Sequence, residues 1–252
     1  MKTIGPDVEL PLASFAENGV ATLRRHVDEN AADELRREIE AFCQSEAIFA
    51  KADAGSDVDG DRYLLNCTAR RFQSYHQLAQ HPLPVVLVRN RHQDSQSADH
   101  GMIDIFNAER LFPACGDVLR ADRVRKLLQD ALGGVWRLDR QHVYINRGVH
   151  FTRPWHIDAA GSPCIKMFVY LTNVLEMEEG PLGYVLGSHR ESQDIEAIGG
   201  GNYAVDLQDE RTAIVLARRG DAALAFTRGV HRGMPQSPGR LRIAVVGTFY
   251  PG

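Results

Sequence analysis

Trp155-His156-Ile157-Asp158, with a second histidine at His231 far along the chain, is the most informative feature of this sequence. Residues i and i+2 of a β-strand point to the same side, so His156 and Asp158 can reach one ion together. Two imidazoles and one carboxylate on one face of a metal ion leave the opposite positions open, as in the ligand set of non-haem Fe(II) oxygenases. A His-x-Asp pair arises by chance in many chains, so the surrounding sequence has to support this interpretation.

Stretches on both sides of these residues have the composition of β-strands. β-branched and aromatic residues dominate 241–250, directly after the turn signal Pro238-Gly239. Further strands are predicted at 164–174, 212–217 and 222–226, which would deliver His231 on the following loop or strand. The fold class predicted from this pattern is mainly β, with a double-stranded β-helix (jelly-roll, cupin-like) core from about residue 135 onward and flanking helices.

Arg242 is the charged residue that stands out in the last of these predicted strands. A guanidinium on a largely apolar strand must meet an anion or reach solvent, because burying it unpaired is costly. Its planar fork suits a carboxylate, so an arginine near an iron site suggests a dicarboxylate co-substrate. Arg240 has the same parity, but it is closer to the turn and more easily solvated, and we therefore prefer Arg242.

The same segments resemble a known family, the phytanoyl-CoA dioxygenase family of Fe(II)- and 2-oxoglutarate-dependent oxygenases. The resemblance covers residues from about 135 to 250 and rests on a set of short motifs: Trp155-His156-Ile157-Asp158, Gly180-Pro181-Leu182, Gly187-Ser188-His189-Arg190, Gly220-Asp221, His231 and Arg242.

The resemblance implies a role for individual residues. His156, Asp158 and His231 would be the iron ligands, and Arg242 would hold the distal carboxylate of 2-oxoglutarate. Asn146 resembles an asparagine that often helps to hold 2-oxoglutarate in the family.

Two departures from the family pattern bear on these roles. Arg232 and Gly233 follow His231, where the family usually has Gly and often Ser, so a hydroxyl contact to the co-substrate is expected to be missing. Leu186 replaces the usual proline, which changes local rigidity.

The implied activity is a dioxygenase reaction with Fe(II), 2-oxoglutarate and O₂, in which a small-molecule metabolite is hydroxylated or otherwise oxidised and succinate and CO₂ are released. A carboxylate at Asp158 argues against halogenation, because halogenating relatives have a small residue there. Two alternatives stay open: a cupin-like metalloenzyme that does not use 2-oxoglutarate, and a non-catalytic barrel that binds a metabolite. Arg242 argues against the first alternative, and the joint presence of three ligands argues against the second.

Five arginines near the motifs suggest that the substrate is anionic, although a solvated barrel rim predicts the same residues: Arg147, Arg153, Arg190, Arg228 and Arg232.

Composition sets the remaining limits. The chain has 252 residues, 44% hydrophobic content and a formal net charge of −4, which suit a single globular domain and give no sign of nucleic-acid binding. No stretch approaches the ~18 apolar residues of a membrane span, and the N-terminus lacks the apolar core of a signal peptide. Four scattered cysteines, Cys43, Cys67, Cys115 and Cys164, predict reduced thiols in a cytoplasmic protein.

The first 134 residues are expected to supply helices and loops that support the core and cover the substrate. One amphipathic helix is predicted over 28–46, with an apolar stripe formed by Ala32, Leu35, Ile39 and Phe42. A second is predicted over 117–132 and ends at Gly133-Gly134. Polar stretches at 52–62 and 90–100 are expected to be loops.

Several other polar residues are given ordinary structural interpretations. Asp57, Asp59 and Asp61 alternate as in a calcium loop, but no glutamate follows at the required spacing, so a solvated loop is expected. His189 is expected to be structural, and His142 and His150 are expected to be solvated or hydrogen-bonded.

Overall fold

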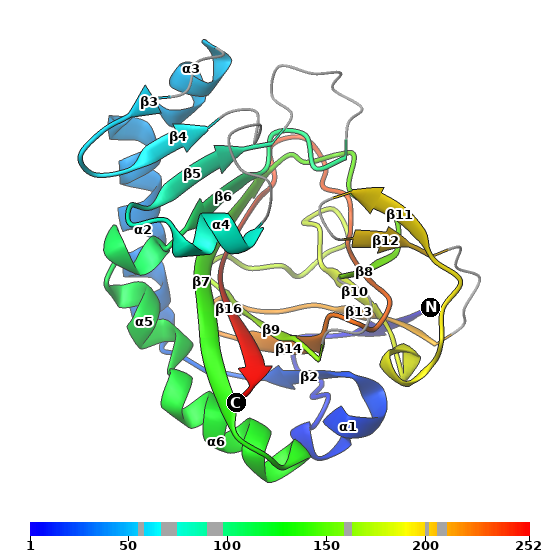
Figure 1. Cartoon of the computed structure of the whole chain (residues 1–252). Coiled ribbons are helices and arrows are strands. Elements are labelled where there is room, and N and C mark those ends of the chain that lie inside the picture. Colours follow the sequence, from blue (N-terminus) through cyan, green and yellow to red (C-terminus); the bar gives the residue numbers. More distant parts are fainter. Residues whose placement is uncertain (55–57, 67–74, 90–97, 159–162, 200–201, 206–210) are drawn as a thin grey trace.

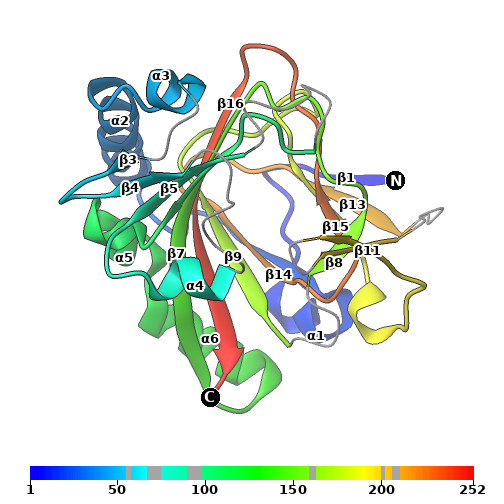
Figure 2. The ribbon, with the colours of Figure 1, turned by 45° about the horizontal axis from the view of Figure 1, so that its top comes forward.

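Two β-sheets face each other in the computed structural model of the chain (Figures 1 and 2). The structure describes all residues except 55–57, 67–74, 90–97, 159–162, 200–201 and 206–210. Within these described residues, one sheet has nine strands and the other has seven. No helix among the described residues is long and apolar enough to cross a membrane.

The jelly roll consists of four neighbouring strands from each sheet. In the larger sheet these are, in order, β14 (Ala222–Phe226), β9 (Ile165–Tyr170), β16 (Leu241–Pro251) and β7 (Trp136–Arg147). In the smaller sheet they are β13 (Thr212–Val215), β10 (Leu182–Val185), β15 (His231–Gly233) and β8 (His156–Asp158). Neighbouring strands within each set are antiparallel. The predicted fold class is therefore confirmed, and the strands expected at 164–174 and 212–217 are shorter than predicted.

The N-terminal half also supplies strands, which the sequence pattern did not indicate. The larger sheet is extended by β2 (Val20–Leu23) beside β14, and beyond β7 by β6 (Ile103–Phe106), β5 (Val85–Val88), β4 (Leu64–Asn66) and β3 (Val58–Asp59). The smaller sheet gains β1 (Lys2–Ile4) from the N-terminal half, beside β13. Beyond β8 it is extended by two strands of the C-terminal half, β12 (Asn202–Ala204) and β11 (Glu196–Gly199).

Helices cover the outer side of the larger sheet (Figure 2). They are α2 (Glu29–Ser45), α5 (Ala114–Leu119) and α6 (Ala121–Leu132). The other α-helices of the described residues are α1 (Phe15–Asn18), α3 (Ile48–Asp53) and α4 (Tyr75–Gln80). The 3-10 helices are η1 (Leu12–Ser14), η2 (Ala108–Arg110) and η3 (Ser188–Arg190).

Helix α2 agrees with its prediction in bounds and in orientation. The Asp28 carboxylate caps its start by accepting hydrogen bonds from the backbone N–H groups of Asn30 and Ala31. Its buried residues are Ala32, Leu35, Ile39 and Phe42, the predicted apolar stripe. These side chains share the main hydrophobic core with the outward-facing residues of β7 and β9.

The single helix predicted over 117–132 is wrong, because the chain breaks there into α5 and α6. Arg120 joins them in the left-handed region, with φ of 45°. Both Leu119 and Leu128 are fully buried. At about 100° per residue they would point to opposite sides of one continuous helix, roughly 180° apart. The break therefore lets both leucines face the same core.

The two polar stretches predicted as loops are only partly described. Residues 55–57 lie outside the described part of the chain. Helix α3 includes residues 52–53 and strand β3 covers residues 58–59, so a loop throughout 52–62 is wrong. Asp57 lies outside the described residues, and Asp59 and Asp61 are exposed. Residues 90–97 of the second stretch also lie outside the described residues.

His26, which ends the segment after β2, is expected to make stability depend on pH. Its side chain is buried and its Nε2–H donates to the Val118 carbonyl over 3.1 Å. Burial, with the nearby charge of Arg123, lowers the pKa of His26 from 6.5 to about 4. Between these two pKa values the unfolded chain binds a proton at His26 and the folded chain does not. The free energy of unfolding therefore falls as the pH drops from 6.5 to about 4.

In wild type, the free energy of unfolding should fall by up to roughly 3 kcal/mol across this pH range because of His26, at about 1.4 kcal/mol per pKa unit. We expect His26→Gln to lack this part of the pH dependence. Urea denaturation of both proteins at several pH values between 6.5 and 4 measures it. Equal slopes for the two proteins would contradict a buried neutral His26.

Candidate metal centre

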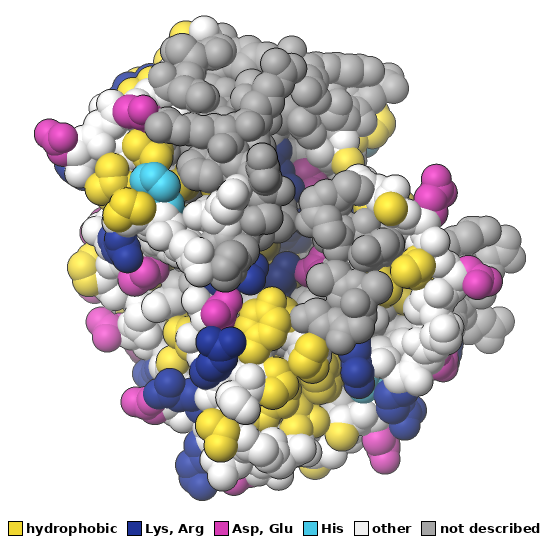
Figure 3. All heavy atoms as spheres, viewed as in Figure 1, with side chains coloured by type: hydrophobic (Ala, Val, Ile, Leu, Met, Phe, Trp, Pro, Cys, Tyr) yellow, Lys and Arg dark blue, Asp and Glu magenta, His cyan; other side chains and the backbone are white. Residues whose placement is uncertain are grey.

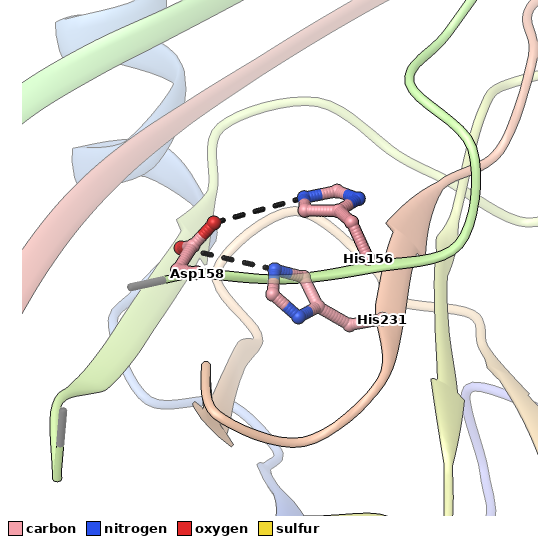
Figure 4. A group of neighbouring side chains, drawn as sticks. All are labelled: His156, Asp158 and His231. Atoms are coloured by element: carbon pink, nitrogen blue, oxygen red, sulfur yellow. Dashed lines mark ion pairs between the residues drawn. The ribbon is translucent and has the colours of Figure 1, made fainter. Parts of the chain in front are cut away.

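Strands β8 and β15 bring the predicted metal ligands together (Figure 4). His231 lies directly opposite His156 in the pairing of these strands, and Asp158 follows two residues later on the same side as His156. Their potential ligand atoms all lie within 4.8 Å of one another. The structure thus places His156, Asp158 and His231 in one group, as the spacing predicted.

Backbone hydrogen bonds fix which nitrogen of each imidazole faces the centre. His156 Nδ1 lies 2.8 Å from the Pro154 carbonyl, and His231 Nδ1 lies 2.9 Å from the Gly229 carbonyl. A carbonyl only accepts, so each Nδ1 carries the proton and each Nε2 keeps its lone pair. The two Nε2 atoms face Asp158 oxygens at 3.7 and 3.9 Å. Such outer partners orient the histidine ligands of metal sites.

Protonation of the three residues also suits a divalent cation. Burial, with the neighbouring His231 and Arg153, lowers the pKa of His156 to about 3, and burial lowers the pKa of His231. Burial alone would raise the pKa of Asp158, but the surrounding positive charges hold it below its ordinary value. Two neutral imidazoles and an ionised carboxylate are the donor forms that metal binding requires.

The three residues line a pocket between the inner faces of the two sheets. Its empty volume is about 720 Å³, a figure that includes the solvent at its open mouth. Figure 3 shows basic and acidic side chains in the hollow at the centre of this face, with apolar side chains below it.

Arg242 lies in the same pocket, on β16, as predicted. Its guanidinium donates to the Asn146 side-chain oxygen over 3.1 Å and to the Gly180 carbonyl. Both acceptors are neutral, and no carboxylate of the described residues pairs with Arg242. Burial lowers the pKa of Arg242, which reflects the cost of holding this charge without an anion.

Asn146 and Gly233 form part of the surroundings of Arg242. Asn146 is buried on β7, directly opposite Arg242 in the strand pairing. A Cβ added at Gly233 would lie 3.4 Å from a terminal nitrogen of Arg242. The glycine therefore leaves space beside the guanidinium and offers no hydroxyl, in agreement with the departure from the family pattern.

Lys166 is a pocket residue that the sequence analysis missed. Its Nζ lies 2.6 Å from Asp158 Oδ2. Burial alone would lower the pKa of Lys166, but the Asp158 charge raises it. The signal was present, since Lys166 alternates with Ile165 and Met167, which face the opposite, fully apolar side of β9.

A second ion pair, also not predicted, lies in the pocket. Arg153 Nε donates to Asp99 Oδ2 over 2.7 Å, and Asp99 is nearly fully buried. Burial opposes ionisation of Asp99, yet Arg153 and Arg89 hold its pKa below the ordinary value. The pair ties the turn before β6 to the segment that leads into β8.

The other arginines expected near the substrate do not line this pocket; of the five, only Arg153 does. Arg147 lies over the Phe49 ring and Arg228 over the Phe226 ring. Arg232 donates to the Thr152 hydroxyl over 3.1 Å. Arg240, rejected as the co-substrate partner, pairs with Glu176 and Glu179 and is 43% exposed.

His142, His150 and His189 do not belong to this group of predicted ligands. His189 donates from Nε2 to the Ala16 carbonyl and stacks on Phe226. His150 is exposed. The expectation of a solvated or hydrogen-bonded His142 is wrong: its ring is buried between Phe106 and Tyr144, and neither nitrogen has a hydrogen-bond partner among the described residues. Aromatic packing therefore holds this ring.

Comparison with known proteins was made with sequences and with structures. No protein-family model matches the chain, and no curated protein matches it. The structure of EvdO2 from Micromonospora carbonacea var. aurantiaca, complexed with 2-oxoglutarate, is 16% identical, with a TM-score of 0.63 over 100% of this chain and 94% of that chain.

Two further solved structures have the same fold. The epimerase SnoN, in complex with Fe³⁺, alpha ketoglutarate and nogalamycin RO, is 15% identical, with a TM-score of 0.62 over 95% of this chain and 82% of that chain. HygX from Streptomyces hygroscopicus, with nickel, 2-oxoglutarate and hygromycin B bound, is 13% identical, with a TM-score of 0.59 over 95% and 86%. At these identities the likeness shows the fold of the chain.

Proposed function

We propose that this protein is an Fe(II)- and 2-oxoglutarate-dependent oxygenase acting on a small-molecule metabolite. The observation that carries the proposal is the placement of Arg242, a half-buried guanidinium without a carboxylate partner among the described residues, in the same pocket as His156, Asp158 and His231. A metal site alone does not require such an arginine. A dicarboxylate that chelates the metal at one end requires a cation at the other.

Different residues of the pocket would bind the metal and the 2-oxoglutarate. His156, Asp158 and His231 would hold the metal on one face, and Arg242 would hold the far carboxylate of 2-oxoglutarate beside Asn146. Bound iron, 2-oxoglutarate and O₂ supply the oxidising chemistry, and succinate and CO₂ are released. The chain itself orients the substrate carbon and keeps both imidazoles neutral.

The solved structures of the same fold support this choice of co-substrate. EvdO2, SnoN and HygX were each solved with 2-oxoglutarate or alpha ketoglutarate, and two of them also with a metal ion. SnoN is an epimerase, so the fold does not by itself select hydroxylation. We propose hydroxylation or a related oxidation, and the resemblance to the phytanoyl-CoA dioxygenase family and a cytoplasmic location stay predictions from the sequence.

Anaerobic titration tests the proposal directly. Apoprotein is titrated with Fe(II) and then with 2-oxoglutarate, and the weak visible metal-to-ligand charge-transfer band is recorded. A band that saturates with 2-oxoglutarate is expected. No band from folded, iron-loaded protein would reject 2-oxoglutarate and favour a cupin-like metalloenzyme that works without it.

The substrate is expected to be a small molecule, and its anionic character now depends on Arg153 instead of five arginines. A panel of anionic and neutral metabolites is screened for stimulated succinate release. We expect Arg153→Gln to raise the KM of an anionic substrate about tenfold, since a charged contact is worth roughly 1.5–3 kcal/mol. Arg232→Gln, outside this pocket, is the matched control. An unchanged KM in Arg153→Gln would count against an anionic substrate.

A further inference from the structure

Lys166 crosses the pocket from one sheet to the other. It starts on β9 in the larger sheet, and its ammonium reaches Asp158 on β8 in the smaller sheet, 2.6 Å from Oδ2. The two side chains are only 20% and 15% exposed. The ion pair therefore joins the two sheets at the metal centre itself.

The other basic side chains of the pocket are engaged elsewhere. Arg153 pairs with Asp99 over 2.7 Å, and Arg242 donates to Asn146 and Gly180. Within the described part of the pocket, Lys166 is thus the cation that contacts a predicted metal ligand. Removing two charges from water is costly, and their mutual attraction offsets that cost only when the geometry is good, so an ion pair at this position requires an explanation.

The two oxygens of Asp158 have different surroundings. Oδ2 accepts a hydrogen bond from Lys166 and lies 3.9 Å from His231 Nε2, while Oδ1 lies 3.7 Å from His156 Nε2 (Figure 4). Carboxylates bind divalent cations through one oxygen or through both. A lysine on Oδ2 favours the first mode, because binding by both oxygens would bring the cation toward the ammonium charge.

We propose that Lys166 is a positioning residue that holds Asp158 Oδ2, so that Asp158 ligates the metal through Oδ1 alone and the neighbouring positions stay open for 2-oxoglutarate. The inference rests on the proposed function, for the metal in its first part and for 2-oxoglutarate in its second. It assigns Lys166 a role in the geometry of the centre and no contact with the substrate.

Crystal structures of the metal-loaded proteins test the first clause. Wild type, Lys166→Met and Lys166→Arg are loaded with Ni(II) or Fe(II) under argon. We expect one-oxygen ligation by Asp158 in wild type and Lys166→Arg, and two-oxygen ligation in Lys166→Met. One-oxygen ligation in Lys166→Met would overturn the proposal.

Affinity for 2-oxoglutarate tests the second clause. In Lys166→Met the dissociation constant from the charge-transfer band should rise about tenfold or more, the usual effect of removing an outer partner of a metal ligand, while Fe(II) binding persists. Unchanged 2-oxoglutarate affinity, or loss of Fe(II) binding, would overturn it. Lys166→Gln replaces Lys166→Met if thermal melting shows that the methionine variant is unfolded.

The two proposals fail in different ways. Wild-type protein that binds metal through one Asp158 oxygen, yet gives no band with 2-oxoglutarate, would reject the proposed co-substrate and support the role of Lys166. A band in wild type together with two-oxygen ligation there would do the reverse.

Discussion

Replacing His156 by alanine is expected to abolish the charge-transfer band with Fe(II) and 2-oxoglutarate and to stop succinate release. The variant loses the Nε2 lone pair that the Pro154 carbonyl directs toward the centre. Fe(II) affinity should fall by more than about 100-fold, because removing even an outer partner of a ligand costs roughly 10–100-fold. Anaerobic Fe(II) titration measures the loss.

His150→Ala is the matched control for this variant. His150 precedes the same strand, and it is exposed. The His150→Ala variant should bind Fe(II) and 2-oxoglutarate as wild type does. Retained Fe(II) affinity in His156→Ala, with the protein folded by circular dichroism, would show that the metal lies elsewhere.

Replacing Arg242 by methionine is expected to weaken binding of 2-oxoglutarate without weakening binding of Fe(II). The metal ligands stay in place, so Fe(II) should bind as in wild type. Affinity for 2-oxoglutarate should fall roughly 30-fold or more, because truncating one partner of a buried charge pair costs about 2–5 kcal/mol. The band should therefore appear only at high 2-oxoglutarate concentrations.

Arg240→Met is the matched control, because it removes a positive charge of the same kind directly before β16. Arg240 is 43% exposed and pairs with Glu176 and Glu179 outside the pocket. Its loss should leave 2-oxoglutarate affinity unchanged. Equal effects from both substitutions would mean that long-range charge, and not a direct contact of Arg242, attracts the co-substrate.

The parts of the fold that the sequence predicted are those with strong local signals. β16 follows a Pro-Gly turn and is rich in β-branched and aromatic residues, and α2 has a capping aspartate and a regular apolar stripe. The break at Arg120 was not predictable in this way, because the pattern on each side is helical and only the shared core decides which face turns inward. Strands β3–β6 were missed because each is only two to four residues long, too short to show a clear alternating pattern. Their pairing with other strands exists only in the folded sheet.

The candidate site shows the same division. His156, Asp158, His231 and Arg242 were predicted because a motif or a lone charge in an apolar strand marked them, and Asn146 was predicted from the family resemblance. Asp99 and Lys166 were missed, since their importance depends on contacts across the pocket with Arg153 and Asp158. Four of the five arginines expected near the substrate do not line the pocket, because nearness in sequence to a motif does not place a side chain in a pocket.

The two N-terminal strands have a consequence for how the protein reaches its final state. β2 pairs with β14 and β1 with β13, so the first residues of the chain close one border of each sheet against strands made some 200 residues later. An uncovered border strand is a template for intermolecular pairing and aggregation. During synthesis these borders stay open until the early segment docks, and a chain shortened by its first 23 residues would keep both permanently exposed.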